Sequence, residues 1–300
     1  MEHATFLRGN TLMLASVLLY GSHGLWANLI GNSFGLFFQA WTRSLIILSM
    51  ILIALLVTGG FRMIERSDRK WFFWSSLCTV SMQAPFFYAF ITIGIGAAML
   101  FFFAMWLLAT YMVGMILLGE KLGVVKILAF MSAIGGLVLL FFSSIDTLSL
   151  AGILCASVTG IASGTQVVLT KKISGEYSPL LITAAAWFGV VMVYLPVSYF
   201  LGETFVPLGL TAPWLYQFGF ACSLLLAFWL IVNGFKHVEA SIGGLFGALI
   251  PVFSLIFGVV ILGESVTLTM LVGGALIVGA ALLPHHEKKA AFVHTMALRK

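Results

Sequence analysis

Apolar runs of about 20 residues recur along the whole chain, each long enough as a helix to cross a bilayer core about 30 Å thick. Short joints that carry glycine, proline or charge separate the runs. Only 8% of the 300 residues are charged, whereas a soluble domain has about 25%, and the mean hydropathy is +1.13. One soluble core could not bury this much apolar surface, so the sequence predicts an all-α membrane protein.

Ten transmembrane helices are predicted from these runs. They cover residues 10–30, 34–57, 71–92, 95–118, 124–142, 149–170, 179–201, 213–235, 239–262 and 266–284. The shortest joints lie near Gly31–Ser33 and Gly94–Gly96.

Lysine and arginine predict the orientation, because they concentrate in cytosolic loops. If both termini are cytosolic, all of the fifteen basic residues except Arg43 fall at cytosolic ends of the ten spans. The net charge of +5 is then explained by topology in the lipid bilayer, and no nucleic-acid partner is expected.

The chain also resembles itself, which predicts an internal repeat. The joint 118-LGEKL-122 returns as 262-LGESV-266, 144 positions later, and Gly135 meets Gly279 at the same offset. The predicted units are a first five-helix repeat, a second five-helix repeat and a basic cytosolic tail, at residues 1–145, 146–284 and 285–300. Because five crossings are odd, the second repeat is inverted, and inverted repeats are typical of secondary transporters that work by alternating access.

These joints, together with the run 240-ASIGGLFGALIPVFSLIFGVVILGE-264, resemble the EamA-type branch of the drug/metabolite transporter superfamily. The similarity extends over about residues 8–284, and Arg43 matches an arginine common in the family's second span. The resemblance implies a ten-helix carrier that moves small organic metabolites across the plasma or inner membrane. The position of the second half that corresponds to Arg43 is Ala184 or a neighbouring residue, so the second half departs from the first there.

Arg43 is a charged residue inside an apolar run, about nine residues or roughly 13 Å from the start of its predicted helix. A charge at this depth costs at least about 2.5–3.5 kcal/mol, so it is expected to face protein or a water-filled cavity. Gln39 shares its helix face. Two interpretations stay open: the guanidinium bonds free backbone carbonyls and stabilises the fold, or it binds a substrate's carboxylate or phosphate.

Polar and aromatic side chains inside the spans are further candidates for lining a binding site. His23, with Tyr20 on nearly the same face, could contact substrate or titrate during transport. Near the middle of span four, Trp106 could wall a pocket or hold a cation by its ring face. The remaining candidates are Phe102, Tyr111, Tyr88, Gln83, Gln166, Trp187 and Trp229. For each of them the alternative is packing or lipid contact without a role in binding.

A second group of residues is predicted to shape or gate the scaffold. Pro251 removes one helix hydrogen bond near the middle of span nine. Gly243 and Gly247, just before it, permit close helix approach. Glu120 and Glu264 end spans four and nine and are expected to be structural or gating residues at the membrane surface.

The sequence therefore predicts a secondary transporter of small organic metabolites, a monomer or homodimer that needs no cofactor or metal. Arg43 has no counter-ion and lies among aromatic residues, which fits a substrate with a carboxylate and an apolar or cationic end. Amino acids are therefore the first candidates, and S-adenosylmethionine-like metabolites or quaternary amines are the alternatives. An enzyme is not expected, because the spans offer one histidine, no acid and no metal-ligand spacing. A channel is not expected either, because no charged ring or selectivity loop is present.

Overall fold

Every regular element that the structure describes is a helix. The computed structural model describes residues 2–58, 63–121, 123–142, 149–263 and 265–297. The helices are α1 (Glu2–Gly21), α2 (His23–Ile30), α3 (Leu36–Thr58), α4 (Arg69–Ser81), α5 (Ala84–Leu118), α6 (Val124–Phe141), α7 (Leu150–Ile173), α8 (Pro179–Phe200), α9 (Ala212–Phe235), α10 (Ala240–Gly247), α11 (Ile250–Leu262) and α12 (Leu268–Ala297). Within these described ranges, eight segments are long and apolar enough to cross a membrane, and Leu268–Leu283 is a shorter apolar helix. The predicted all-helical architecture is confirmed.

Two of the predicted spans meet in one helix. The segment predicted as 71–92 is divided between α4 and the first turns of α5, and the segment 95–118 continues the same helix α5. Near Gly94–Gly96, where the sequence predicts a joint, α5 has a kink at Gly94 (φ 76°, ψ 162°). Glycine fits there because a side chain disfavours positive φ.

Another interruption lies in the segment predicted as 239–262. Helix α10 ends at Gly247, and α11 begins with Ile250 and has Pro251 in its first turn. Proline is tolerated in that position because the first-turn N–H has no partner within the helix. The interruption predicted at Pro251 is therefore a division of the span into two short helices, α10 and α11.

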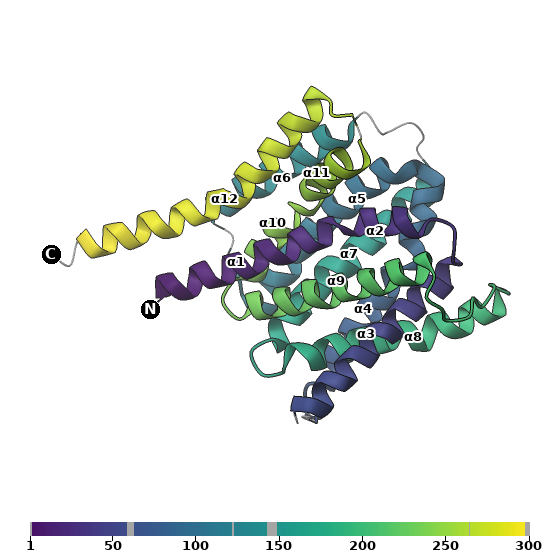
Figure 1. Ribbon diagram of the computed structural model, residues 1–300. Helices are drawn as coiled ribbons and strands as arrows, with labels where there is room; N and C mark the ends of the chain where they lie inside the picture. Colours follow the sequence, from purple (N-terminus) through teal and green to yellow (C-terminus); the bar gives the residue numbers. More distant parts are fainter. Residues whose placement is uncertain (1, 59–62, 122, 143–148, 264, 298–300) are drawn as a thin grey trace.

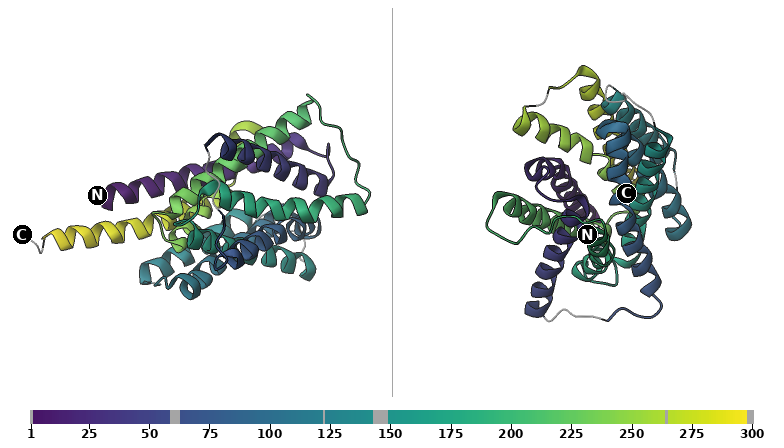
Figure 2. Two further views of the ribbon diagram at one scale, coloured as in Figure 1. Left: turned by 90° about the horizontal axis from the view of Figure 1, so that it is seen from below. Right: turned by 90° about the vertical axis from the view of Figure 1, so that its right-hand side faces the viewer.

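Helices far apart in the sequence pack along one another (Figure 1). The main pairs are α5 with α7, α6 with α12, α3 with α8 and α1 with α9. In Figures 1 and 2, α1 begins and α12 ends on the same side of the bundle. An even number of crossings would place the two ends in this way.

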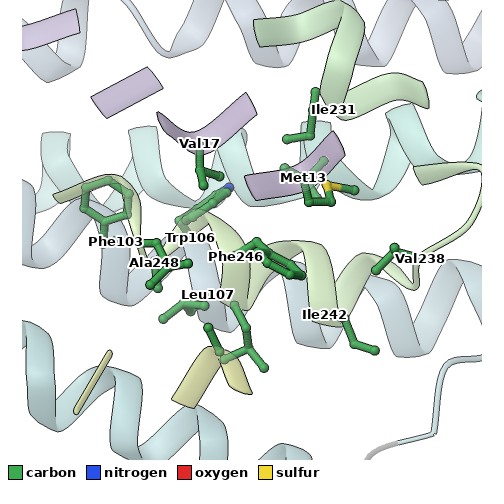
Figure 3. Packing of buried hydrophobic residues seen from close by; sticks show 14 of the residues in the cluster. Met13, Val17, Phe103, Trp106, Leu107, Ile231, Val238, Ile242, Phe246 and Ala248 are labelled. Carbon is green, nitrogen blue, oxygen red and sulfur yellow. The ribbon is translucent and has the colours of Figure 1, made fainter. Parts of the chain in front are cut away.

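The largest hydrophobic cluster of the described residues extends over many helices and includes the contact between α1, α5 and α10 (Figure 3). In this view Trp106 of α5 lies between Phe103 of the same helix and Phe246 of α10, and Val17 and Met13 of α1 lie above them. Close helix contacts surround this core. Gly160 and Gly164 of α7 pack against α5: a Cβ would come 2.3 Å from Phe102 O at Gly160 and 2.4 Å from Trp106 O at Gly164.

Candidate functional site

Arg43 of α3 is buried, with 6% of its surface exposed. Its guanidinium carbon Cζ lies 4.3 Å from the ring centroid of Phe220 on α9, a cation–π contact. Its Nε is buried without a hydrogen-bond partner. Among the described residues, no carboxylate or carbonyl oxygen bonds to its side chain. The ring of Phe220 therefore offsets part of the cost of burial, and the charge has no counter-ion from this part of the chain.

His23 lies against the same aromatic ring as Arg43, and Tyr20 lies against His23. The His23 ring is 4.9 Å from Phe220 and 5.0 Å from Tyr20, both edge-on. The Nε2 atom of His23 is buried without a hydrogen-bond partner. The structure thus brings together three of the predicted residues, Arg43, His23 and Tyr20, between α1, α2, α3 and α9.

Gln217 of α9 completes this group and was missed by the sequence reasoning. It is fully buried, and its Nε2 donates to Gln39 O at 2.7 Å and to Thr42 Oγ1 at 3.0 Å. Its Oε1 has no partner. The predicted residue Gln39 therefore enters through its backbone carbonyl. A glutamine inside the apolar run 213–235 was the signal, because polar groups in spans are costly. We call Tyr20, His23, Arg43, Gln217 and Phe220 the Arg43 site.

Trp106 lies in a separate group from Arg43. It is buried in the cluster of Figure 3 and stacks on Phe102, with ring centroids 6.5 Å apart. Gly247 of α10 lies directly against the indole, where a Cβ would come 1.4 Å from Cη2. Gly243 is similarly close to the ring of Phe235. The side chain of Tyr20 packs against both this cluster and the one between α3 and α8, so it connects the two regions.

Three further candidates have contacts of their own. Tyr111 is buried and donates to Lys126 O at 3.4 Å. Gln166 donates from Nε2 to Thr79 Oγ1 at 3.1 Å, between α7 and α4. Trp187 is buried between α3 and α8, with its Nε1 unpaired.

Three candidates lie nearer the surface. Gln83 lines a small crevice together with Phe37 and Tyr194. Tyr88 is 48% exposed and Trp229 is 40% exposed.

Two glutamates hold the first turns of distant helices. Glu120 accepts from Ala240 N and Ser241 N of α10 at 2.6 and 3.0 Å. Glu203 accepts from Phe37 N and Phe38 N of α3 at 3.0 and 2.6 Å. A carboxylate is stabilising there because first-turn N–H groups lack partners and the helix dipole is positive at that end. We call these contacts the Glu120 clasp and the Glu203 clasp; Glu264, also predicted as a gate, lies outside the described residues.

The Glu203 clasp gives a first prediction. Replacing Glu203 by Gln leaves one acceptor oxygen for two N–H groups, and Ser198 Oγ, which donates to the carboxylate at 2.7 Å, loses a charged acceptor. Hydrogen bonds to charged groups contribute about 1.5–3 kcal/mol, so we expect a lower melting temperature in detergent. Glu203→Asp is the control, because aspartate keeps the negative charge but has a side chain shorter by one methylene group. A Glu203→Gln protein as stable as the native one would contradict this role.

The chain is similar to known proteins in sequence and in fold. The family described as the EamA-like transporter family matches residues 150–284. An uncharacterized transporter of Haemophilus influenzae is 30% identical over 125 residues, which are 41% of this chain and 73% of that relative. A solved crystal structure matches 94% of this chain and 97% of its own, with a TM-score of 0.79 and 17% identity. At that identity the likeness concerns the fold alone.

Proposed function

The chain belongs to the EamA-like transporter family, and we propose that this membrane transporter carries small organic metabolites with a carboxylate, with amino acids as the first candidates. The buried Arg43 guanidinium is the observation that carries the proposal. It rests on Phe220 and has an Nε without a partner. A carboxylate matches guanidinium geometry in bidentate fashion.

Alternating access between two inverted halves is the proposed mechanism. Support comes from the packing pairs, because α3 with α8 and α6 with α12 join helices of the same rank in the two predicted repeats. The clasps support it too: Glu120 lies in the first predicted repeat and holds α10 of the second, and Glu203 does the reverse. Two halves joined at such contacts can exchange shapes around a site between them.

The substrate alternatives differ in what they offer to Arg43. A quaternary amine without an acid group would place a second cation beside the guanidinium, and the two like charges would repel each other. S-adenosylmethionine-like metabolites carry a carboxylate and remain the second candidate. With no acidic side chain of the described residues bonded to Arg43, we favour a facilitator or exchanger over a proton-driven carrier.

Counterflow with purified protein in liposomes tests this function. Vesicles preloaded with each of the common amino acids are expected to accumulate the same labelled amino acid for at least one member, most strongly for a bulky apolar one. Protein-free liposomes are the control. If only S-adenosylmethionine is transported, it replaces amino acids as the proposed substrate. If no compound with a carboxylate is transported, the role given to Arg43 is rejected.

A further inference from the structure

The orientation of the Gln217 amide follows from its hydrogen bonds. Its Nε2 meets two acceptors, because Gln39 O is a carbonyl and Thr42 Oγ1 gives its own proton to Phe38 O at 2.7 Å. An amide oxygen in that position would face two lone pairs. The nitrogen is therefore anchored to α3, and Oε1 is left as a fully buried acceptor without a partner.

The residue with the free acceptor is connected to Arg43 through Phe220 and through Thr42. On α9, Gln217 precedes Phe220 by three residues, so the two share a helix face with Cβ atoms about 5–6 Å apart. On α3, Thr42, which holds the Gln217 amide, directly precedes Arg43, whose guanidinium covers the Phe220 ring. Buried polar groups without partners are unusual in proteins, and here one is a cationic donor and the other an acceptor.

We propose that Gln217 selects primary amines: its Oε1 accepts an N–H from the substrate's ammonium group while Arg43 binds the carboxylate. The inference rests on the proposed function and narrows its substrates to α-amino acids, whose two charged groups are attached to one carbon. An N-trimethylated analogue has no N–H to donate, and a deaminated analogue leaves Oε1 unpaired. Sites built to hydrogen-bond a substrate N–H reject analogues that lack it.

Aromatic rings around the site predict the probe. Phe220, Tyr20 and His23 form an aromatic wall beside Arg43, which suits an amino acid with a flat apolar side chain. We therefore choose L-phenylalanine, with 3-phenylpropionate and N,N,N-trimethyl-L-phenylalanine as analogues that keep the carboxylate and the ring. All three are used as competitors of L-phenylalanine counterflow in the wild-type protein and its variants.

The expected result is that wild-type protein prefers L-phenylalanine to both analogues by roughly tenfold or more, as for loss of one charge-assisted hydrogen bond. Gln217→Met, which keeps the volume but removes the acceptor, should lose most of that preference by weakening L-phenylalanine alone. Gln166→Met is the matched control, because Gln166 is a buried glutamine that also donates to a threonine hydroxyl; it should keep the preference.

The outcomes separate the inference from the function beneath it. Wild-type protein that takes the trimethylated analogue as well as L-phenylalanine would overturn the role of Gln217, whether or not any variant folds. That role is also rejected if folded Gln217→Met keeps the wild-type preference, and in both cases the carboxylate carrier stands. If neither L-phenylalanine nor any other amino acid of the counterflow panel is bound, the proposed amino-acid function is rejected, and the role of Gln217, which depends on it, is rejected as well.

Discussion

Gly247→Leu is expected to prevent normal folding, because there is no space for a side chain between α10 and Trp106. A Cβ at Gly247 would lie 1.4 Å from Cη2 and 2.1 Å from Cζ3 of the indole. The Trp106 side chain cannot retreat freely, since Phe103, Val17 and Ala248 surround it (Figure 3). Overpacking a core costs about 1–3 kcal/mol and sometimes more, and this overlap is severe. We expect a large drop in melting temperature and in the monodisperse fraction on size-exclusion chromatography.

A double-mutant cycle identifies the cause of that loss. Trp106→Ala alone should cost about 3–5 kcal/mol through the cavity it leaves. Combined with Gly247→Leu, it should cost clearly less than the sum of the single changes, because leucine then fills part of the space. Gly279→Leu is the control, since no atom lies within 4 Å of a Cβ there. Additive effects in the cycle would show that Trp106 is not the obstacle.

Arg43→Met should abolish most transport while leaving the fold as stable as before or more stable. Methionine keeps an apolar stem against Phe220 but removes a buried charge that has no counter-ion among the described residues. Replacing buried charge by well-packed apolar groups is often neutral or stabilising. For a bound carboxylate, the loss of about 1.5–3 kcal/mol per charged hydrogen bond corresponds to roughly 10-fold to 150-fold weaker half-saturation in counterflow.

The two interpretations of Arg43 give opposite results in this experiment. If the guanidinium stabilised the fold through backbone carbonyls, Arg43→Met would lower the melting temperature together with transport. Arg43→Lys refines the answer, because lysine keeps the charge but loses the planar fork and its contact with the ring. We expect Arg43→Lys to fold and to bind carboxylates more weakly than the wild type. A stable Arg43→Met protein with unchanged half-saturation would eliminate the substrate role.

The helices were predictable from the sequence because the bilayer imposes length and apolarity on each segment locally. The grouping of side chains was less predictable, because it depends on which helices meet. Arg43, His23 and Tyr20 do lie together, but Trp106 belongs to the contact between α1, α5 and α10. The missed residue Gln217 carried the same local signal as Gln166, a polar amide in an apolar run, and only the packing of α9 on α3 distinguishes them.

The partners of Glu120 and Glu203 could not be predicted from local patterns. Both residues lie at helix ends, which explains their position near the membrane surface. Their partners, however, are backbone N–H groups 120 and 166 positions away, and backbone groups leave no trace in composition or periodicity. The sequence therefore predicted a structural or gating role for Glu120 without indicating which backbone groups it binds.

The Glu203 clasp has a consequence for the order in which the protein matures. Helix α3 is synthesised early, yet its first-turn N–H groups meet their acceptor only after Glu203 has been made, 166 residues after Phe37. Arg43, on the same helix, waits still longer for the ring of Phe220. Until then the nascent chain carries a cation in an apolar segment without the partners that offset its cost. Ribosome-bound chains that end before α9 should therefore hold α3 less firmly in the membrane than chains that extend beyond it.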